Sequence, residues 1–202
     1  MANTQLPGFI PYTKGNQTVE LVRKRVLTNN TTAIFKGDMV DNVTTGDVIV
    51  SASASVDNYS VQWGGASYMS GNDRLERKYL PAATLYTSSG VDPSNASYVY
   101  IVDDMVNTKF KASVDEAIAL LDLGINYQVV LGTGSTSSGL SGHELDATSR
   151  GTTATLPWRV IDFAPLDYVQ HKDVDAADAH VVCIMNAGNR ESALEPGGSL
   201  GT

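Results

Sequence analysis

Serine, threonine and glycine are abundant in this chain, and together they limit how much of it can be helical. There are 18 residues of each type among the 202. Glycine and serine favour turns, and threonine packs well on a pleated sheet, whereas all three weaken helices. The composition therefore predicts a mainly β protein.

The balance of charges argues against a general nucleic-acid-binding protein. Lysine and arginine number 14 against 22 aspartates and glutamates, so the formal net charge is −8. Affinity for phosphate depends on clustered Lys and Arg, and the cluster Arg23-Lys24-Arg25 is short. The chain is 42% apolar, too much for a disordered chain, yet its apolar runs are too interrupted for a membrane span. We therefore expect a soluble protein with neither a nucleic-acid nor a membrane partner.

The N-terminal residues and the cysteine content indicate the compartment. Residues 1–7 contain no charged segment followed by an apolar one, so they do not resemble a signal peptide. Cys183 is the one cysteine, which excludes an internal disulfide framework. It stands in an apolar run and predicts a buried structural thiol rather than a reactive one. We expect the protein to be made and kept in a cytosol.

The order of polar and apolar stretches divides the chain into four parts. Prolines and glycines interrupt its beginning, and the charged window 72–78 predicts a solvated connection near the middle. Two Gly-Asp pairs, Gly37-Asp38 and Gly46-Asp47, predict hairpin corners. The predicted parts are an N-terminal arm (1–18), a small β subdomain (19–80), a β-barrel or β-sandwich domain (81–187) and a flexible C-terminal tail (188–202).

Stretches rich in β-branched and aromatic residues predict the individual strands. The clearest is 97–102, and 109–114 alternates charged and apolar side chains, so these two are predicted to pair with each other. One short helix is predicted at about 113–123, because Ser113 and Glu116 have the spacing of a capping box. Further strands are predicted at 127–131, 156–163 and 179–186.

The residue types that could carry catalysis have simpler explanations. Ser141, His143 and Asp146 are close in sequence, but side chains so near one another on an extended chain rarely converge as a triad. The segment 142–146 begins like a zinc-peptidase helix, but Ala147 occupies the place of the second histidine ligand. We therefore predict no catalytic residue, no metal site and no enzymatic activity.

Two further patterns suggest ligands and are also explained without them. The loop 132–139 contains Gly-x-Gly but lacks the third glycine and the lysine of phosphate-binding loops, which predicts a flexible connection between strands. The aspartates between 162 and 178 lack the spacing of a calcium loop, which predicts a solvated acidic face. No cofactor is predicted.

A succession of turn and strand motifs covers residues 78–186, about half of the chain. The motifs are Lys78-Tyr79-Leu80-Pro81, the turn 87–95, and the segments 123–127, 138–146, 156–160 and 181–186. This succession resembles virion structural proteins of tailed bacteriophages, notably small capsid decoration (cement) proteins of marine and cyanobacterial phages. The corners Gly37-Asp38 and Gly46-Asp47 are similar to those in the small β domains of lambda-like head decoration proteins.

The resemblance implies a function in the virion. It implies a β-barrel or β-sandwich that is made in the host cytoplasm, docks on the outer surface of the icosahedral head and bridges subunits of the major capsid protein. It also implies a homo-oligomer, a homotrimer in preference to a dimer, that needs no cofactor. The alternative is a receptor- or glycan-binding β domain of a head or tail fibre.

The predicted N-terminal arm contains the candidate capsid contacts. Phe9, Ile10 and Tyr12 are apolar or aromatic residues within an otherwise polar segment, so we expect them to be exposed. Exposed apolar side chains on an arm can become ordered on a neighbouring subunit and add contact area. The sequence therefore predicts capsid attachment through these three residues.

Overall fold

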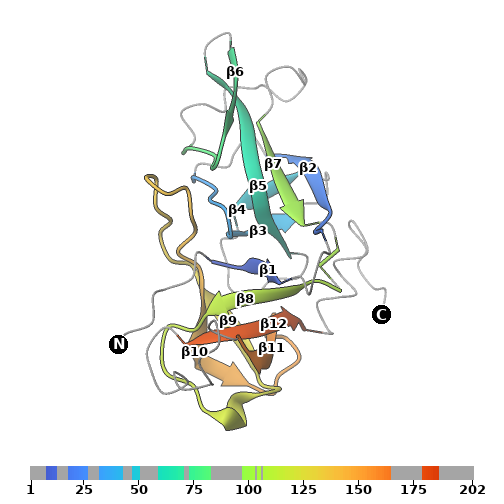
Figure 1. The fold of residues 1–202 in the computed structure, drawn as a ribbon, viewed down its shortest axis with the longest axis vertical. Helices are drawn as coiled ribbons and strands as arrows, with labels where there is room; N and C mark the ends of the chain where they lie inside the picture. The colour runs from blue at the N-terminus through green and yellow to red at the C-terminus, as the bar shows by residue number, and fades with distance from the viewer. Residues whose placement is uncertain are drawn as a thin grey trace.

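The computed structural model describes residues 8–12, 18–26, 32–42, 47–50, 59–70, 73–82, 97–102, 104–105, 107–164 and 179–186. Within these residues the chain is mainly β, as the composition predicts, and its curled sheets form a half-barrel. Figure 1 shows the two sheets one above the other along the long axis of the molecule, with β1 (Ile10–Tyr12) between them.

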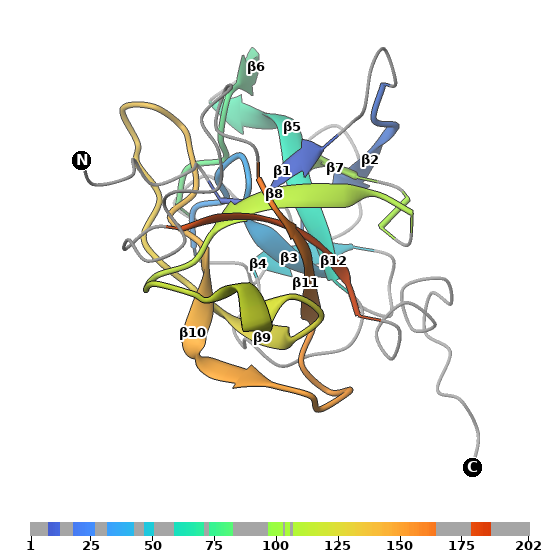
Figure 2. The ribbon, with the colours of Figure 1, turned by 60° about the horizontal axis from the view of Figure 1, so that its bottom comes forward.

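The lower sheet has six antiparallel strands and curls back on itself. In order across the sheet, they are β1, β8 (Lys109–Ser113), β12 (His180–Met185), β11 (Trp158–Phe163), β9 (Asn126–Val130) and β10 (Glu144–Gly151). Just beyond β8, Val114 forms a parallel bridge with Leu145 of β10. This bridge brings β10 back toward β8, and Figure 2 shows the resulting curl with the bottom of the molecule turned forward.

The upper sheet is formed mainly by the first half of the chain. In order across the sheet, its strands are β2 (Leu21–Arg25), β7 (Tyr98–Val102), β5 (Tyr59–Ser70), β3 (Met39–Asn42) and β4 (Val48–Val50), and β6 (Asp73–Arg77) pairs with β5. The charged window 72–78 is therefore largely a strand, and its prediction as a solvated connection is wrong. Among the described strands β6 pairs with β5 alone, and charged side chains are common on such an edge strand.

The core of the lower sheet continues into the upper one. Phe110 and Trp158 are buried inside the curl and contact each other edge to face, with ring centroids 5.3 Å apart. The indole Nε1–H of Trp158 donates to the sulfur of Met39 at 3.1 Å. Val61 and Val102 of the upper sheet belong to the same buried cluster. The two sheets therefore pack as one body around a shared core.

Strand pairing joins residues on both sides of the boundary predicted between residues 80 and 81. The strand predicted at 97–102 exists as β7, but it pairs with β2 and β5 in the upper sheet. The predicted pairing of β7 with β8 is wrong, because β8 pairs with β1 and β12. The residues between β7 and β8 therefore carry the chain from one sheet to the other instead of forming a hairpin.

The short helix predicted at 113–123 is reduced to a three-residue 3-10 turn at Leu120–Asp122, labelled η1. Ser113 is the last residue of β8 and does not cap a helix. The backbone N–H groups that follow are already used, because Val114 donates to Ala179 O and Asp115 donates to Leu145 O. Val114 is therefore held in bridge pairing with Leu145, and the backbone from 115 to 119 is not helical.

The prediction of an exposed N-terminal arm is wrong for residues 8–12. Phe9 is fully buried, and its ring stacks on Trp158 with a centroid distance of 4.4 Å. Its backbone N–H donates to Gly37 O at 3.0 Å. Before it, Gly8 has φ of +67°, and a Cβ there would meet Gly37 O at 2.5 Å. The rest of the predicted arm up to residue 17, and the predicted tail 188–202, lie outside the described residues.

Candidate contact surface

Ser141 and His143 do meet a carboxylate, but it belongs to Asp38 and not to Asp146. Nδ1 of His143 accepts the Met39 N–H at 3.1 Å, and its Nε2 lies 3.5 Å from Oδ1 of Asp38. Ser141 Oγ accepts the N–H of His143 at 3.0 Å, and Oδ2 of Asp38 accepts the N–H of Phe35 at 2.8 Å. All three side chains are buried. Both ring nitrogens therefore face groups other than the serine.

This arrangement joins the two sheets and does not activate a nucleophile. A general base has to face the hydroxyl whose proton it removes, and neither nitrogen of His143 faces Ser141. Because Nδ1 accepts a backbone N–H, the ring is neutral and carries its proton on Nε2, toward Asp38. Burial lowers the pKa of His143 and raises the pKa of Asp38, and in each residue the partner's charge opposes the shift.

Sequence reasoning missed Asp38 as a partner because it lies more than a hundred residues before His143. The turn predicted at Gly37-Asp38 positions the Asp38 side chain. In this turn Gly37 has φ of 97°, and the Asp38 N–H donates to Phe35 O at 3.0 Å. Asp146 instead accepts the N–H and hydroxyl of Thr148 within its own turn.

The structure also places the residues considered for metal binding. The segment that follows His143 is strand β10, whereas the zinc-peptidase motif requires a helix. Among the residues that the structure describes, no group of three His, Cys, Asp or Glu could hold a metal ion. Of the aspartates predicted to form an acidic face, Asp162 is exposed, and the others lie outside the described ranges.

Cys183 is fully buried in β12, as predicted from its apolar neighbours. Its Sγ lies 3.6 Å from Phe110 O, and burial raises the pKa of the thiol well above its usual range. We expect a water-soluble disulfide reagent to label this thiol at least about a thousandfold more slowly in the native protein than in denaturant, because labelling requires unfolding. Comparable rates in the two states would contradict the burial of this strand.

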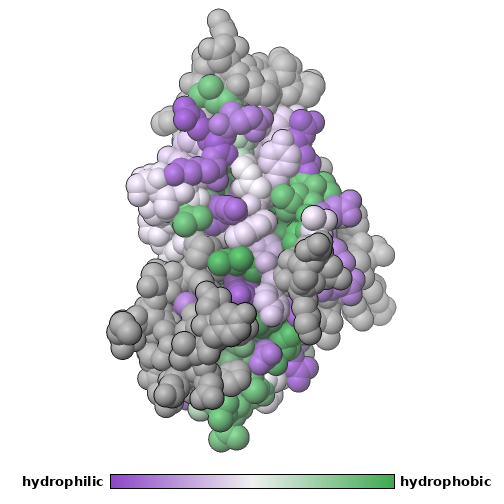
Figure 3. All heavy atoms as spheres, in the orientation of Figure 1, coloured by the Kyte–Doolittle hydropathy of each residue, from purple (hydrophilic) through white to green (hydrophobic). Residues whose placement is uncertain are grey.

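Three exposed leucines form the most apolar surface feature among the described residues. Leu120, Leu121 and Leu123 are 64%, 90% and 40% exposed. We call residues 119–124 the leucine turn. In Figure 3 the hydrophobic colour at the lower tip of the molecule lies where Figure 1 shows this turn. A tight turn of exposed leucines at one end of a domain is a typical protein contact site.

The leucine turn is held firmly although its leucines are exposed. Oδ2 of Asp122 accepts the Ala119 N–H at 2.7 Å and lies 3.4 Å from Nη1 of Arg150. Gly124, at φ of +84°, donates its N–H to Val160 O at 2.8 Å. A turn that is already ordered loses little conformational entropy when a partner covers it.

The predicted capsid contacts lie elsewhere and only partly on the surface. Phe9 is in the core, whereas Ile10 and Tyr12 of β1 are half-buried. The ammonium of Lys111 lies 5.0 Å from the centroid of the Tyr12 ring. The structure therefore does not bring the three residues together as one contact site, and the leucine turn, which sequence reasoning missed, is far more exposed. The sequence feature that could have indicated the leucine turn is the pair Leu120-Leu121 beside Asp122, which was instead assigned to the predicted helix.

Comparisons with known proteins do not place this chain in a family. No protein-family model matches it, and neither the curated proteins nor the solved structures contain a match. No helix among the described residues is long and apolar enough to cross a membrane. The functional argument therefore depends on the leucine turn and the surface around it.

Proposed function

We propose that the protein is a tailed-phage capsid decoration (cement) protein, which binds the outer surface of the head and bridges subunits of the major capsid protein. It acts by contact and not by chemical transformation, and it binds as a homo-oligomer. The observation that carries this proposal is the leucine turn, an ordered apolar projection at one end of a β domain. The resemblance of residues 78–186 to decoration proteins supplies the partner.

The energetics suit a protein that is present in many copies. Burying an exposed leucine side chain contributes about 1.5–3 kcal/mol, so one leucine turn provides modest affinity. Subunits in a symmetric shell present many equivalent sites close together, and a homo-oligomer engages several at once. Once one subunit of the oligomer has bound, the others are at high effective concentration near the neighbouring sites, so weak individual contacts are sufficient for stable binding.

Leu121→Asp is expected to weaken binding to purified heads that lack this protein by more than about tenfold, because a centrally buried apolar anchor contributes about 2 kcal/mol or more. Binding is measured by cosedimentation of the purified protein with the heads. Leu21→Asp, at a 37% exposed leucine on β2, is the matched control and should bind normally. Unchanged binding of the Leu121 variant would remove the leucine turn from the interface.

A second observation favours the alternative, a glycan-binding domain. A hollow of about 600 Å³ is lined by Glu76, Arg77, Lys78, Tyr79, Pro81 and Thr136. Polar groups beside an aromatic ring are suited to a saccharide. Screening on a glycan array separates the two functions. A glycan-binding domain should bind a glycan on the array and lose this binding when Tyr79 is replaced by alanine. A decoration protein should show no such binding.

A further inference from the structure

A row of side chains that includes two basic residues crosses the outer face of the lower sheet. Strand pairing places Tyr12 opposite Lys109, Lys109 opposite Ile184, and Ile184 opposite Arg159. Neighbouring strands are about 4.8 Å apart, so these side chains form a continuous row across four strands. We call Tyr12, Lys109, Lys111, Ile184 and Arg159 the basic face.

The inward and outward alternation of β8 confirms that its lysines lie on this outer face. Phe110 and Ala112 are buried in the core, whereas Lys109 is exposed and Lys111 half-buried. Asp162, opposite Val182 on the neighbouring strands, is the exposed carboxylate of this region. Among the described outward-facing residues of β8, β12 and β11, three are therefore cationic and one is a carboxylate, although the whole chain carries −8.

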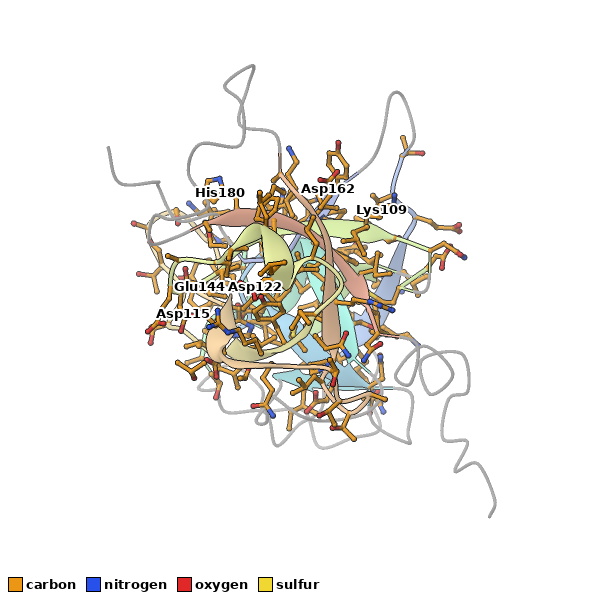
Figure 4. All side chains as sticks on the ribbon, turned by 90° about the horizontal axis from the view of Figure 1, so that it is seen from below. Lys109, Asp115, Asp122, Glu144, Asp162 and His180 are labelled. Carbon is orange, nitrogen blue, oxygen red and sulfur yellow. The ribbon has the colours of Figure 1, made fainter. Side chains whose placement is uncertain are left out.

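The basic face is continuous with the leucine turn. Nε of Arg159 donates to Gly124 O at 3.1 Å, which fixes the guanidinium against the turn. On the other side of the turn, Asp122 pairs with Arg150. Figure 4 shows Asp115, Asp122 and Glu144 gathered on one side of the curl and Lys109 on the opposite side. Charge is therefore distributed unequally about the apolar projection.

The neighbouring sheet edge is unsuited to binding an added strand. Pro11 is the middle residue of β1, the edge strand of the lower sheet, and it lies opposite Phe110. Proline has no N–H, so this short strand cannot present a regular set of donors to another strand. A partner would therefore contact the face of the sheet and not its edge.

We propose that the leucine turn and the basic face form one docking surface, and that its occupant is a protein surface with an apolar pocket bordered by carboxylates on one side. The argument for this occupant is charge complementarity. Carboxylates of the partner would face Lys109, Lys111 and Arg159, while the acidic side of the turn would disfavour the reversed orientation. This inference rests on the proposed function, because it specifies the surface that the capsid subunit presents.

The test compares two charge reversals of equal size. Lys109→Glu with Lys111→Glu changes the basic face, and Arg23→Glu with Lys24→Glu changes β2 of the upper sheet. The pairs are matched, because Arg23 lies over the Tyr98 ring as Lys111 lies over the Tyr12 ring. Both leave the bond from Arg159 to Gly124 in place. Binding to purified heads lacking this protein is measured at about 0.05 M and about 0.3 M NaCl, which spans strong and weak screening.

We expect the reversal on the basic face to weaken binding by at least about tenfold at low salt and to flatten its salt dependence, whereas the control reversal changes affinity less than about twofold. Equal loss in both variants would overturn the proposal, because it would show a general charge effect. Tighter binding of the first variant would also overturn it. Absence of binding by the unmodified protein would overturn the proposed function together with this inference, so the two failures are distinguishable.

Discussion

Replacing Phe9 with alanine is expected to lower the free energy of unfolding by about 3–5 kcal/mol. The ring is completely buried and stacks on Trp158, so its removal leaves a cavity at the centre of the shared core. The loss should appear as a lower denaturant midpoint with an unchanged slope in equilibrium unfolding by guanidinium.

Ile10→Ala is the matched control for this substitution. Ile10 is the next residue in the same segment and is only half-buried, so we expect its loss to cost less than about 2 kcal/mol. Equal midpoints for Phe9→Ala and the unmodified protein would show that Phe9 does not occupy the core. The burial of Phe9 also means that deleting residues 1–15 cannot serve as a test of binding. The deletion removes a core ring and destabilises the domain as a whole.

Replacing His143 with alanine should cost about 1–3 kcal/mol at pH 7.5, because the substitution leaves a buried backbone donor without its acceptor. The substitution deprives the Met39 N–H of its acceptor and leaves Asp38 facing a cavity. Chemical unfolding of the two proteins at the same pH measures the difference.

The cost of that substitution should become smaller as the pH falls below about 6.5, the usual pKa of histidine. Burial lowers the pKa of His143, so the unfolded chain binds more protons than the folded one below that pH. Stability from His143 is therefore present above about pH 6.5 and is lost as the pH falls toward the folded pKa. Asp38 acts in the opposite sense at acidic pH, because burial raises its pKa and the folded state then binds more protons.

His143→Gln separates titration from packing. Glutamine can accept the Met39 N–H but does not titrate, so the stability difference between the unmodified protein and this variant should shrink from pH 7.5 to pH 5.5. A difference that stays constant over this interval would show that His143 does not change its protonation on unfolding.

The strands were predictable because their signals are local. Alternation in Lys109–Ser113 and the apolar run around Cys183 identified β8 and β12, and both are strands in the lower sheet. The sequence also predicted a buried cysteine and a turn at Gly37-Asp38, although the segments on its two sides pair with other strands and do not form the predicted hairpin. In each case a few consecutive residues contain the whole signal, so no knowledge of distant neighbours is needed.

Features that depend on distant partners were not predictable in the same way. Phe9 and Trp158 are separated by most of the chain, and nothing near Phe9 reveals that its ring completes the core. The helix predicted after Ser113 fails for the same reason, because distant residues, Ala179 and Leu145, hold Val114 in sheet pairing. The leucine turn was missed because apolar residues at helical spacing predict burial, whereas their exposure depends on how the sheet curls.

The central position of β12 also affects when the domain can form. This strand lies between β8 and β11, although it is the last described strand in the chain. A nascent polypeptide ending before residue 180 lacks the partner that joins those two strands, and sheets dominated by such long-range pairing fold slowly. We therefore expect the lower sheet to close late in folding, once β12 is available to join β8 and β11.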